Sequence, residues 1–267
     1  MMLHRKTART AAAWSVALMM ASPIIWMALT AFKTDLEASR FPPSLVFQPT
    51  LENVALAGAS LARPTLNSVA EAVGATGLCF LLGFPAAYAL AFGEMRARNT
   101  ILLGMLATRL TPGIGVMIPI YLIFKAVGLI DTLVGLALVF ALTNLPIVVW
   151  LLFSSMREIP REILESARLD GATPKQQLLL ILLPLCAPGL CSTALLSVIL
   201  CWNEAFWSVQ LTSSAGMPVS AFVGTLSGDL LWAKFSASSL LAVGPILLIG
   251  WAAQRQLVRG LTFGAVR

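Results

Sequence analysis

Three ionisable side chains stand inside or at the end of long apolar runs of this sequence. They are Glu71, Arg109 and Glu204. Charged groups are costly to place in a membrane and by default mark function there, so we interpret these three as candidates for lining a solute pathway. For Arg109 a second interpretation stays open, in which the guanidinium pairs with a carboxylate and holds two helices together.

Neutral polar groups and aromatic rings extend this set of candidates. Asn144 precedes Pro146 in a further apolar run, and Asn203 and Trp207 flank Glu204. Amides can donate and accept hydrogen bonds, and an aromatic ring offers a flat face to C–H groups, so we add these residues to the candidates for lining the pathway. Pro146 could also free a backbone carbonyl as a further acceptor. The alternative for Trp207 is an ordinary place in the interfacial aromatic belt.

Catalytic and metal-binding patterns are missing from the sequence. The only histidine, His4, lies in a basic leader, and no nucleophile stands beside a base in any apolar run. The dipeptide Gly-Lys of the ATP-binding phosphate loop does not occur. We therefore expect no enzyme, no metal and no cofactor on this chain, and any ATP and Mg²⁺ would be bound by a partner subunit. Four cysteines lie in apolar runs without metal-ligand spacing: Cys79, Cys186, Cys191 and Cys201.

The composition indicates which kind of secondary structure carries these residues. Of 267 residues 58% are hydrophobic and 11% are charged, which is too apolar for a soluble domain of this length. Apolar runs of roughly 20 residues predict helices that cross a membrane. The sequence thus predicts an all-α polytopic membrane protein of one domain, residues 1–267, with six transmembrane helices. The runs are Thr10–Phe32, Ala72–Gly93, Leu110–Phe124 (preceded by Asn99–Thr108 and read through Arg109), Thr132–Met156, Gln176–Asn203 and Phe235–Gln254.

The connecting segments give the orientation. With the N-terminus inside, the inner segments hold twelve Lys and Arg residues and the outer segments hold five. The positive-inside rule therefore places both termini in the cytoplasm, and the net charge of +6 needs no nucleic-acid partner. The first run is longer than a signal peptide core, so we expect it to be retained. Lys33–Pro64 is predicted as an outer loop with a short helix, and Ala205–Lys234 as an outer segment that could dip into the membrane.

One inner segment, residues 157–175, is charged in a way that the rest of the chain is not. Eight of its nineteen residues are charged. Pro160 suits a helix start, Ile163, Leu164 and Ala167 share one face, and Gly171 supplies a left-handed stop. Thr173-Pro174-Lys175-Gln176 then reads as a capping box that starts the next helix. The pattern predicts a short amphipathic helix on the inner face, which, taken alone, could simply rest in the lipid headgroups.

The spacing within this segment resembles a family signature. Glu165-Ser166-Ala167, three residues, Gly171, nine residues and Ile181-x-Leu183-Pro184 is similar to the E-A-A-x(3)-G-x(9)-I-x-L-P motif of permease subunits in binding-protein-dependent ATP-binding-cassette (ABC) importers. Ser166 departs from it by replacing an alanine. The resemblance implies the type I ABC importer permease fold. It also implies that residues 157–175 form the coupling loop, which docks on an ATP-binding subunit through Glu165, Ser166, Ala167, Asp170 and Gly171.

Four further stretches resemble the second permease subunit of the maltose-type carbohydrate importers. They are "LNSV" (66–69), "IPIYLIFKAVGLIDTLVGL" (118–136), "WNEAFW" (202–207) and the tail "QRQLVRGLTFGAVR". The last two are similar to the sorbitol and mannitol permeases of that branch. The resemblance implies a bacterial inner-membrane importer of a polyol or sugar. Its partners would be a second, different permease subunit, two ATP-binding subunits and an external solute-binding protein.

A stand-alone secondary transporter or channel for a small solute is the main alternative. It would need ion-relay carboxylates in mid-membrane, and only Glu71 is arguably of that kind. It would also leave the charged 157–175 segment unexplained.

The predicted orientation is testable by labelling. A single cysteine placed at Arg161 (Arg161→Cys in a chain without its native cysteines) should react with a membrane-impermeant maleimide only after the cells are opened, because the positive-inside rule places this loop in the cytoplasm. Labelling from outside intact cells would contradict the orientation.

Overall fold

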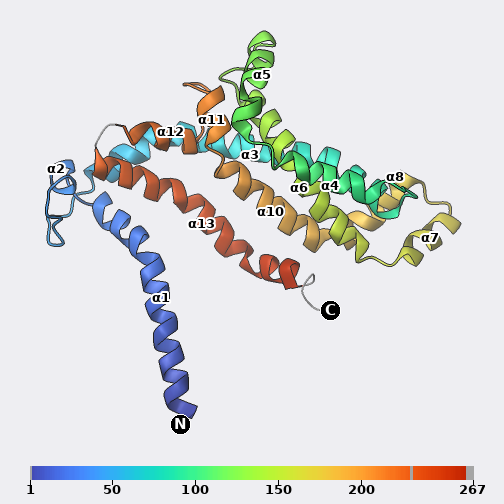
Figure 1. The fold of residues 1–267 in the computed structure, drawn as a ribbon, viewed down its shortest axis with the longest axis horizontal. Coiled ribbons are helices and arrows are strands. Elements are labelled where there is room, and N and C mark those ends of the chain that lie inside the picture. The colour runs from blue at the N-terminus through green and yellow to red at the C-terminus, as the bar shows by residue number, and fades with distance from the viewer. Residues whose placement is uncertain (1, 229–230, 263–267) are drawn as a thin grey trace. The chain divides into compact units, whose positions relative to one another are not determined.

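A computed structural model describes residues 2–228 and 231–262, all in helices and their connections. For residues 2–8 and 252–262 only the backbone is described, so the side chain of His4 and those of the tail QRQLVRGLTFGAVR lie outside the description. The elements (Figure 1) are α1 Met2–Ala31, α2 Asp35–Ala38, α3 Glu52–Phe92, α4 Arg98–Thr108, α5 Gly113–Ala126, α6 Leu133–Arg157, α7 Arg161–Leu169, α8 Pro174–Gln176, the π-helix η1 Gln177–Leu182, α9 Leu183–Leu185, α10 Ala187–Trp202, α11 Phe206–Leu211, α12 Val219–Leu226 and α13 Trp232–Thr262.

Long apolar helices account for the predicted spans. Within the described residues, four helices are long and apolar enough to cross a membrane, in α1, α3, α6 and α13. Two bent pairs bring the number to six if each pair is one span: α4 with α5, and Pro174–Leu185 with α10. These six elements coincide with the six apolar runs of the sequence, but the third and fifth runs are not straight helices.

The third run was expected to continue through Arg109, and this expectation is wrong. α4 ends at Thr108, α5 begins at Gly113, and their axes differ by 85°. Pro112 has an extended backbone with ψ of 128°. A proline disfavours helical conformation in the residue before it and lacks the N–H that would bond to the preceding turn. The chain therefore turns at Pro112, and Arg109 lies beside a break instead of inside a helix.

The fifth run is also broken. It starts with the predicted capping box, in which Thr173 Oγ1 accepts from the Gln176 backbone N–H and Gln176 Oε1 accepts from that of Thr173. The chain then widens into η1 and bends by 82° at Cys186, before α10. Pro188, in the first turn of α10, cannot donate to the turn before it, which explains why the helix is interrupted here.

The second span begins earlier than predicted. Residues 52–64 were assigned to the outer segment Lys33–Pro64, predicted as a loop with a short helix from its FPPS and QPT stretches, but α3 runs from Glu52 to Phe92 with Pro64 and Pro85 inside it. A proline removes one backbone hydrogen bond from a long helix, and here that loss does not end the helix. The expected short helix in the outer segment is α2.

The described residues form two compact units, and α3, α12 and α13 each contribute to both. One unit holds residues up to 63 and 222–245, and the other holds 64–221 and the residues from 246 onward. In the first unit, Lys33 is buried and its Nζ donates to the Ser44 carbonyl at 2.7 Å, 4.7 Å from the Trp26 ring centroid. Asp35 Oδ1 accepts from the backbone N–H groups of residues 233 and 234 at the start of α13. The loop after α1 is thus tied to both neighbouring helices.

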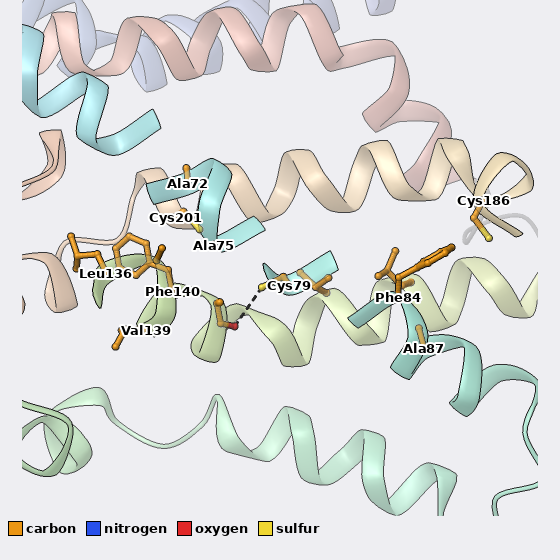
Figure 2. Packing of buried hydrophobic residues seen from close by; sticks show 14 of the residues in the cluster. Ala72, Ala75, Cys79, Phe84, Ala87, Leu136, Val139, Phe140, Cys186 and Cys201 are labelled. Carbon is orange, nitrogen blue, oxygen red and sulfur yellow. Dashed lines mark hydrogen bonds between the residues drawn. The ribbon is translucent and has the colours of Figure 1, made fainter. Parts of the chain in front are cut away.

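The core of the second unit lies between α3, α6 and α10 (Figure 2). α3 contributes Ala72, Ala75 and Cys79, whose thiol donates to the Ala141 carbonyl of α6 at 3.4 Å. α10 packs along α6, with α7 and α8 at one end of this pair and α11 at the other (Figure 1). The candidate coupling residues therefore lie at one end of this pair, and Trp207 of α11 lies at the other.

Small residues permit these helices to approach closely. A Cβ atom added to Gly83 of α3 would lie 3.3 Å from Val149 of α6, and one on Gly189 of α10 would overlap Ser155 of α6. Lipid tails are as apolar as leucine, so close packing of this kind drives helix association in membranes.

The loop that follows α11 is fixed by Asp131, which stands before α6 with a positive φ of 57°. Its carboxylate accepts the backbone N–H groups of four consecutive residues, 213–216, at 3.0–3.1 Å, and the Ser214 hydroxyl at 2.9 Å. Asn67 of α3 donates to the carbonyls of Ala215 and Met217, both at 3.0 Å. Partial burial alone would raise the pKa of Asp131, but the four backbone donors favour the charged carboxylate and together lower that pKa well below its usual range.

The Asp131 contacts predict the pH dependence of this loop. A lowered pKa means that the carboxylate stabilises the folded loop fully above its ordinary pKa of about 3.9, and that this contribution fades only as pH falls through the lowered value. Hydrogen-exchange protection of residues 213–216, corrected for intrinsic rates, should therefore be flat between about pH 5 and 8.

Asp131→Asn removes the charge and one acceptor oxygen, so exchange at residues 213–216 should rise roughly tenfold, a moderate effect because the site is partly exposed to water. Asp170→Asn, the same change on α7, is the control and should leave this loop unchanged. Equal protection in Asp131→Asn and the parent protein would show that the loop does not depend on the carboxylate.

Candidate functional site

The charged inner segment forms a short helix, as predicted. α7 runs from Arg161 to Leu169 directly after Pro160. Gly171 follows with φ of 85°, the left-handed conformation that glycine adopts without strain. The Ala172 N–H bonds back to the Ala167 carbonyl at 2.9 Å, which closes the helix end. The predicted stop at Gly171 and the capping box after it are both confirmed.

α7 has one buried side chain and a broad exposed face. Leu164 is 1% exposed and belongs to the same buried cluster as Met156 of α6 and Leu182 of η1. Ala167 is half-buried, but Ile163, predicted for the same face, is 40% exposed. Leu169 is 90% exposed. Two apolar side chains therefore remain on the outer surface of a helix that is otherwise charged.

The motif residues lie together on this outer surface. Glu165, Ser166, Asp170 and Gly171 are all exposed. A carboxylate pair beside small residues offers charge complementarity and close backbone approach to a partner protein. The geometry suits docking to a partner protein.

The helix is tied to the rest of its unit at both ends. Arg161 Nη2 donates to the Ala91 carbonyl in the last turn of α3 at 3.4 Å, a favourable place for a cation. Arg168 Nε donates to Gln177 Oε1 at 3.3 Å, and Tyr88 of α3 donates to the same oxygen at 3.0 Å. Gln177 and Tyr88 were not recognised in the sequence. The only available signal was a second glutamine after the capping box, at the start of an apolar run.

Among the pathway candidates, Arg109 and Asn144 are brought together. Arg109 Nη1 donates to Asn144 Oδ1 at 3.1 Å, and Asn144 Nδ2 donates to the Cys201 sulfur at 3.3 Å. Within the described residues Arg109 thus pairs with an amide and not with the carboxylate that one interpretation required. Asn144 is buried, Arg109 is exposed beside the break in the third span, and α6 continues unbroken through Pro146.

Glu71 lies elsewhere in the core of the same unit. It is 1% exposed, and neither carboxyl oxygen accepts a hydrogen bond of ordinary geometry from the described residues. The side chain of Ser68, one turn earlier on α3, is its polar neighbour. In this conformation Glu71 faces packed helices and not an open path.

The residues after α10 have local structural roles. Asn203 Nδ2 donates to the Ile199 carbonyl at 2.9 Å, and Glu204 Oε1 accepts the Trp207 N–H in the first turn of α11 at 3.2 Å. Trp207 is buried and stacks edge-on against Phe206, so it is not a lipid-facing belt residue. The exposed side chain of Asn203 and the half-exposed carboxylate of Glu204 remain available to a solute.

Comparisons with known proteins show the family of this chain. Residues 80–262 match the family "Binding-protein-dependent transport system inner membrane component". The chain is 29% identical over 252 residues to the trehalose transport system permease protein SugB of Mycobacterium tuberculosis (92% of each chain covered). It is also 29% identical over 257 residues to the trehalose/maltose transport system permease protein MalG of Thermococcus litoralis (92% of this chain, 91% of that protein).

A solved structure supports the fold. One chain of a bacterial ABC transporter involved in the import of the acidic polysaccharide alginate superposes with a TM-score of 0.77 at 20% identity, covering 94% of this chain and 95% of that one. The family match covers more than half of the sequence, including α7 and both broken spans. This chain belongs to the family of inner-membrane components of binding-protein-dependent transport systems, as a multi-pass permease with the ABC importer fold.

Proposed function

We propose that this chain is a permease subunit of an ATP-driven importer for a sugar or polyol, and that α7 couples an ATP-binding subunit to the membrane helices. The observation that carries the proposal is the exposed motif surface of α7, held on the core by Leu164. A helix docked by charged and small residues is a rigid joint, through which closure of the ATP-binding subunits can move the spans.

The partners follow from the family and from the proposed orientation. A binding-protein-dependent ABC permease works with an ATPase, a solute-binding protein and a partner permease, so the nucleotide is bound by a separate subunit. We propose a heterodimer with a second permease subunit, two ATP-binding subunits, both termini and the loop 157–175 in the cytoplasm, and residues 1–267 acting as a single permease domain.

A stand-alone transporter or channel fits less well. It would leave the exposed carboxylates and apolar tips of α7 without a role. It also disagrees with membership of a family that depends on a binding protein.

The substrate class rests on similarity and on the polar groups of the spans. The relatives named above transport trehalose or maltose. Arg109 is exposed and uses one nitrogen on Asn144, so its other N–H groups can donate to hydroxyls. We propose a pathway lined by Asn144, Arg109, Asn203, Glu204 and Trp207, with Glu71 joining only in a conformation that uncovers it. The "WNEAFW" stretch favours a polyol such as sorbitol or mannitol.

Two substitutions on α7 and its stop test the coupling role. Gly171→Pro forces a negative φ where φ is 85°, and Glu165→Lys reverses an exposed charge, so both should abolish uptake and co-purification of the ATP-binding subunit without preventing insertion. Gly58→Ala, where an added Cβ meets open space, and Glu52→Lys, at another exposed helix start, are the controls. Normal transport in both α7 variants would rule the coupling role out.

The pathway is tested by removing hydrogen-bonding groups. Asn144→Leu and Glu204→Leu should each leave a substrate hydroxyl unpaired in a partly desolvated site, at about 1–3 kcal/mol, so uptake falls roughly five- to a hundred-fold. ATPase activity stimulated by the loaded binding protein should largely survive, because docking is untouched. The control is Thr143→Val, whose hydroxyl bonds its own helix at Phe140.

Labelled sorbitol, mannitol, maltose and trehalose would be compared in these strains. Unchanged uptake of all four would remove Asn144 and Glu204 from the pathway. Uptake of maltose or trehalose alone by the parent strain would overturn the polyol assignment.

A further inference from the structure

A buried amide stands where the inner segment enters the membrane helix. Gln177 is 1% exposed and begins η1. Its Oε1 accepts from the Tyr88 hydroxyl at 3.0 Å and from Arg168 Nε at 3.3 Å, while its Nε2 donates to the Ala172 carbonyl at 2.9 Å. Both acceptor positions of the amide oxygen are therefore used.

These bonds join three separate elements. Tyr88 belongs to α3, Arg168 to α7, and Ala172 to the turn that follows Gly171. An apolar side chain would avoid the desolvation of an amide at this depth, whereas a polar one is tolerated because all three contacts are made. The amide thus fixes the turn to a helix 89 residues earlier in the chain.

α7 has two further attachments to the same body. At its start Arg161 reaches the Ala91 carbonyl of α3, and in its middle Leu164 is buried in the core that includes Ala91. The cytoplasmic end of α3 therefore holds α7 at its beginning and, through Gln177, at its end.

Without Gln177, the C-terminal end of α7 would be only weakly connected to α3. Asp170 and Gly171, in the turn between α7 and α8, are both exposed, and Gly171 has a positive φ of 85°. Force applied to the end of α7 would then rotate this turn more readily and would reach the spans only through Arg161 and Leu164, since exposed turns with few buried contacts open easily.

We propose that Gln177 is a positioning residue for coupling: it makes α7, the turn after it and the cytoplasmic end of α3 move as one body. The inference rests on the proposed docking role of α7. It adds that a displacement of α7 passes to α3 through the Gln177–Tyr88 bond as well as along the chain into α10.

Substitutions at Gln177 separate positioning from docking. Gln177→Met has a similar size but makes none of the three bonds, so uptake per ATP hydrolysed should fall roughly tenfold while the ATP-binding subunit still co-purifies. Gln177→Glu keeps both acceptor positions but loses the N–H group that bonds the Ala172 carbonyl, so uptake should fall less than in Gln177→Met. In Tyr88→Phe, uptake per ATP hydrolysed should lie between the values of these two variants. Combining Tyr88→Phe with Gln177→Met should lower it no further than Gln177→Met alone.

Gln176→Met is the matched control, because it alters the exposed neighbouring glutamine and weakens only the capping box. Uptake would be followed with whichever of labelled sorbitol, mannitol, maltose and trehalose the parent strain takes up. All values would be normalised to the amount of permease in the membrane.

A measurement on the assembled complex tests the rigid body directly. Nitroxide labels at Leu169→Cys on α7 and Glu94→Cys after α3, both exposed positions, would be placed in a chain with Cys191→Ser. The label–label distance should stay narrow and unchanged when the non-hydrolysable analogue AMP-PNP is added, and it should broaden in Gln177→Met.

Three results would overturn the proposal. They are a nucleotide-dependent change of this distance in the parent complex, an unchanged ratio of uptake to ATP hydrolysis in Gln177→Met, and an equal loss in Gln176→Met. Failure of the docking role is distinguishable, because Glu165→Lys would then leave co-purification of the ATP-binding subunit intact.

Discussion

The packing of α6 between α3 and α10 is the contact on which the rest of the larger unit depends. α6 buries residues along its whole length, from Gly135 to Met156. On one side Gly83 of α3 meets Val149, and on the other Gly189 of α10 meets Ser155. Because these approaches leave no room for larger side chains, they fix how the three helices lie along one another. The burial of Leu164 and Asn144 depends on this packing of α3, α6 and α10.

In the larger unit, two membrane spans are broken at places where polar groups find hydrogen-bond partners. The break after α4 places Arg109 against Asn144. At the bend, the Cys186 N–H donates to the Leu182 carbonyl, and the Cys186 carbonyl accepts from the Leu190 N–H, both at 2.8 Å. In hydrocarbon an unpaired backbone group costs several kcal/mol, so irregular segments persist only inside protein or beside water. In the proposed pathway, the two bent spans are the places where polar groups can be exposed, whereas α6 is an unbroken helix.

Hydropathy and turn chemistry predicted the six apolar elements, the short α7, its stop at Gly171 and the capping box at Thr173, because each depends on neighbouring residues. The bends at Pro112 and Cys186 were missed, since prolines also occur inside unbroken α3 and α6. Position alone did not reveal which prolines interrupt a helix. The partners of Gln177 and Asp131 lie up to 89 residues away, and no local pattern shows such pairs.

The π-helix has a consequence for the length of the chain between α7 and α10. A single π-turn holds one more residue than an α-helix of the same height, so η1 is equivalent to a one-residue insertion. Deleting one residue between Gln177 and Leu182 would restore regular α-helical periodicity with little rotation, whereas deleting one residue from α10 would rotate everything on one side by about 100° relative to the other. Glu165 and Asp170 would then face a different direction while every local motif stayed intact. We therefore expect the register of this segment, and not its hydrophobicity alone, to set which face of α7 is available for the proposed docking on an ATP-binding subunit.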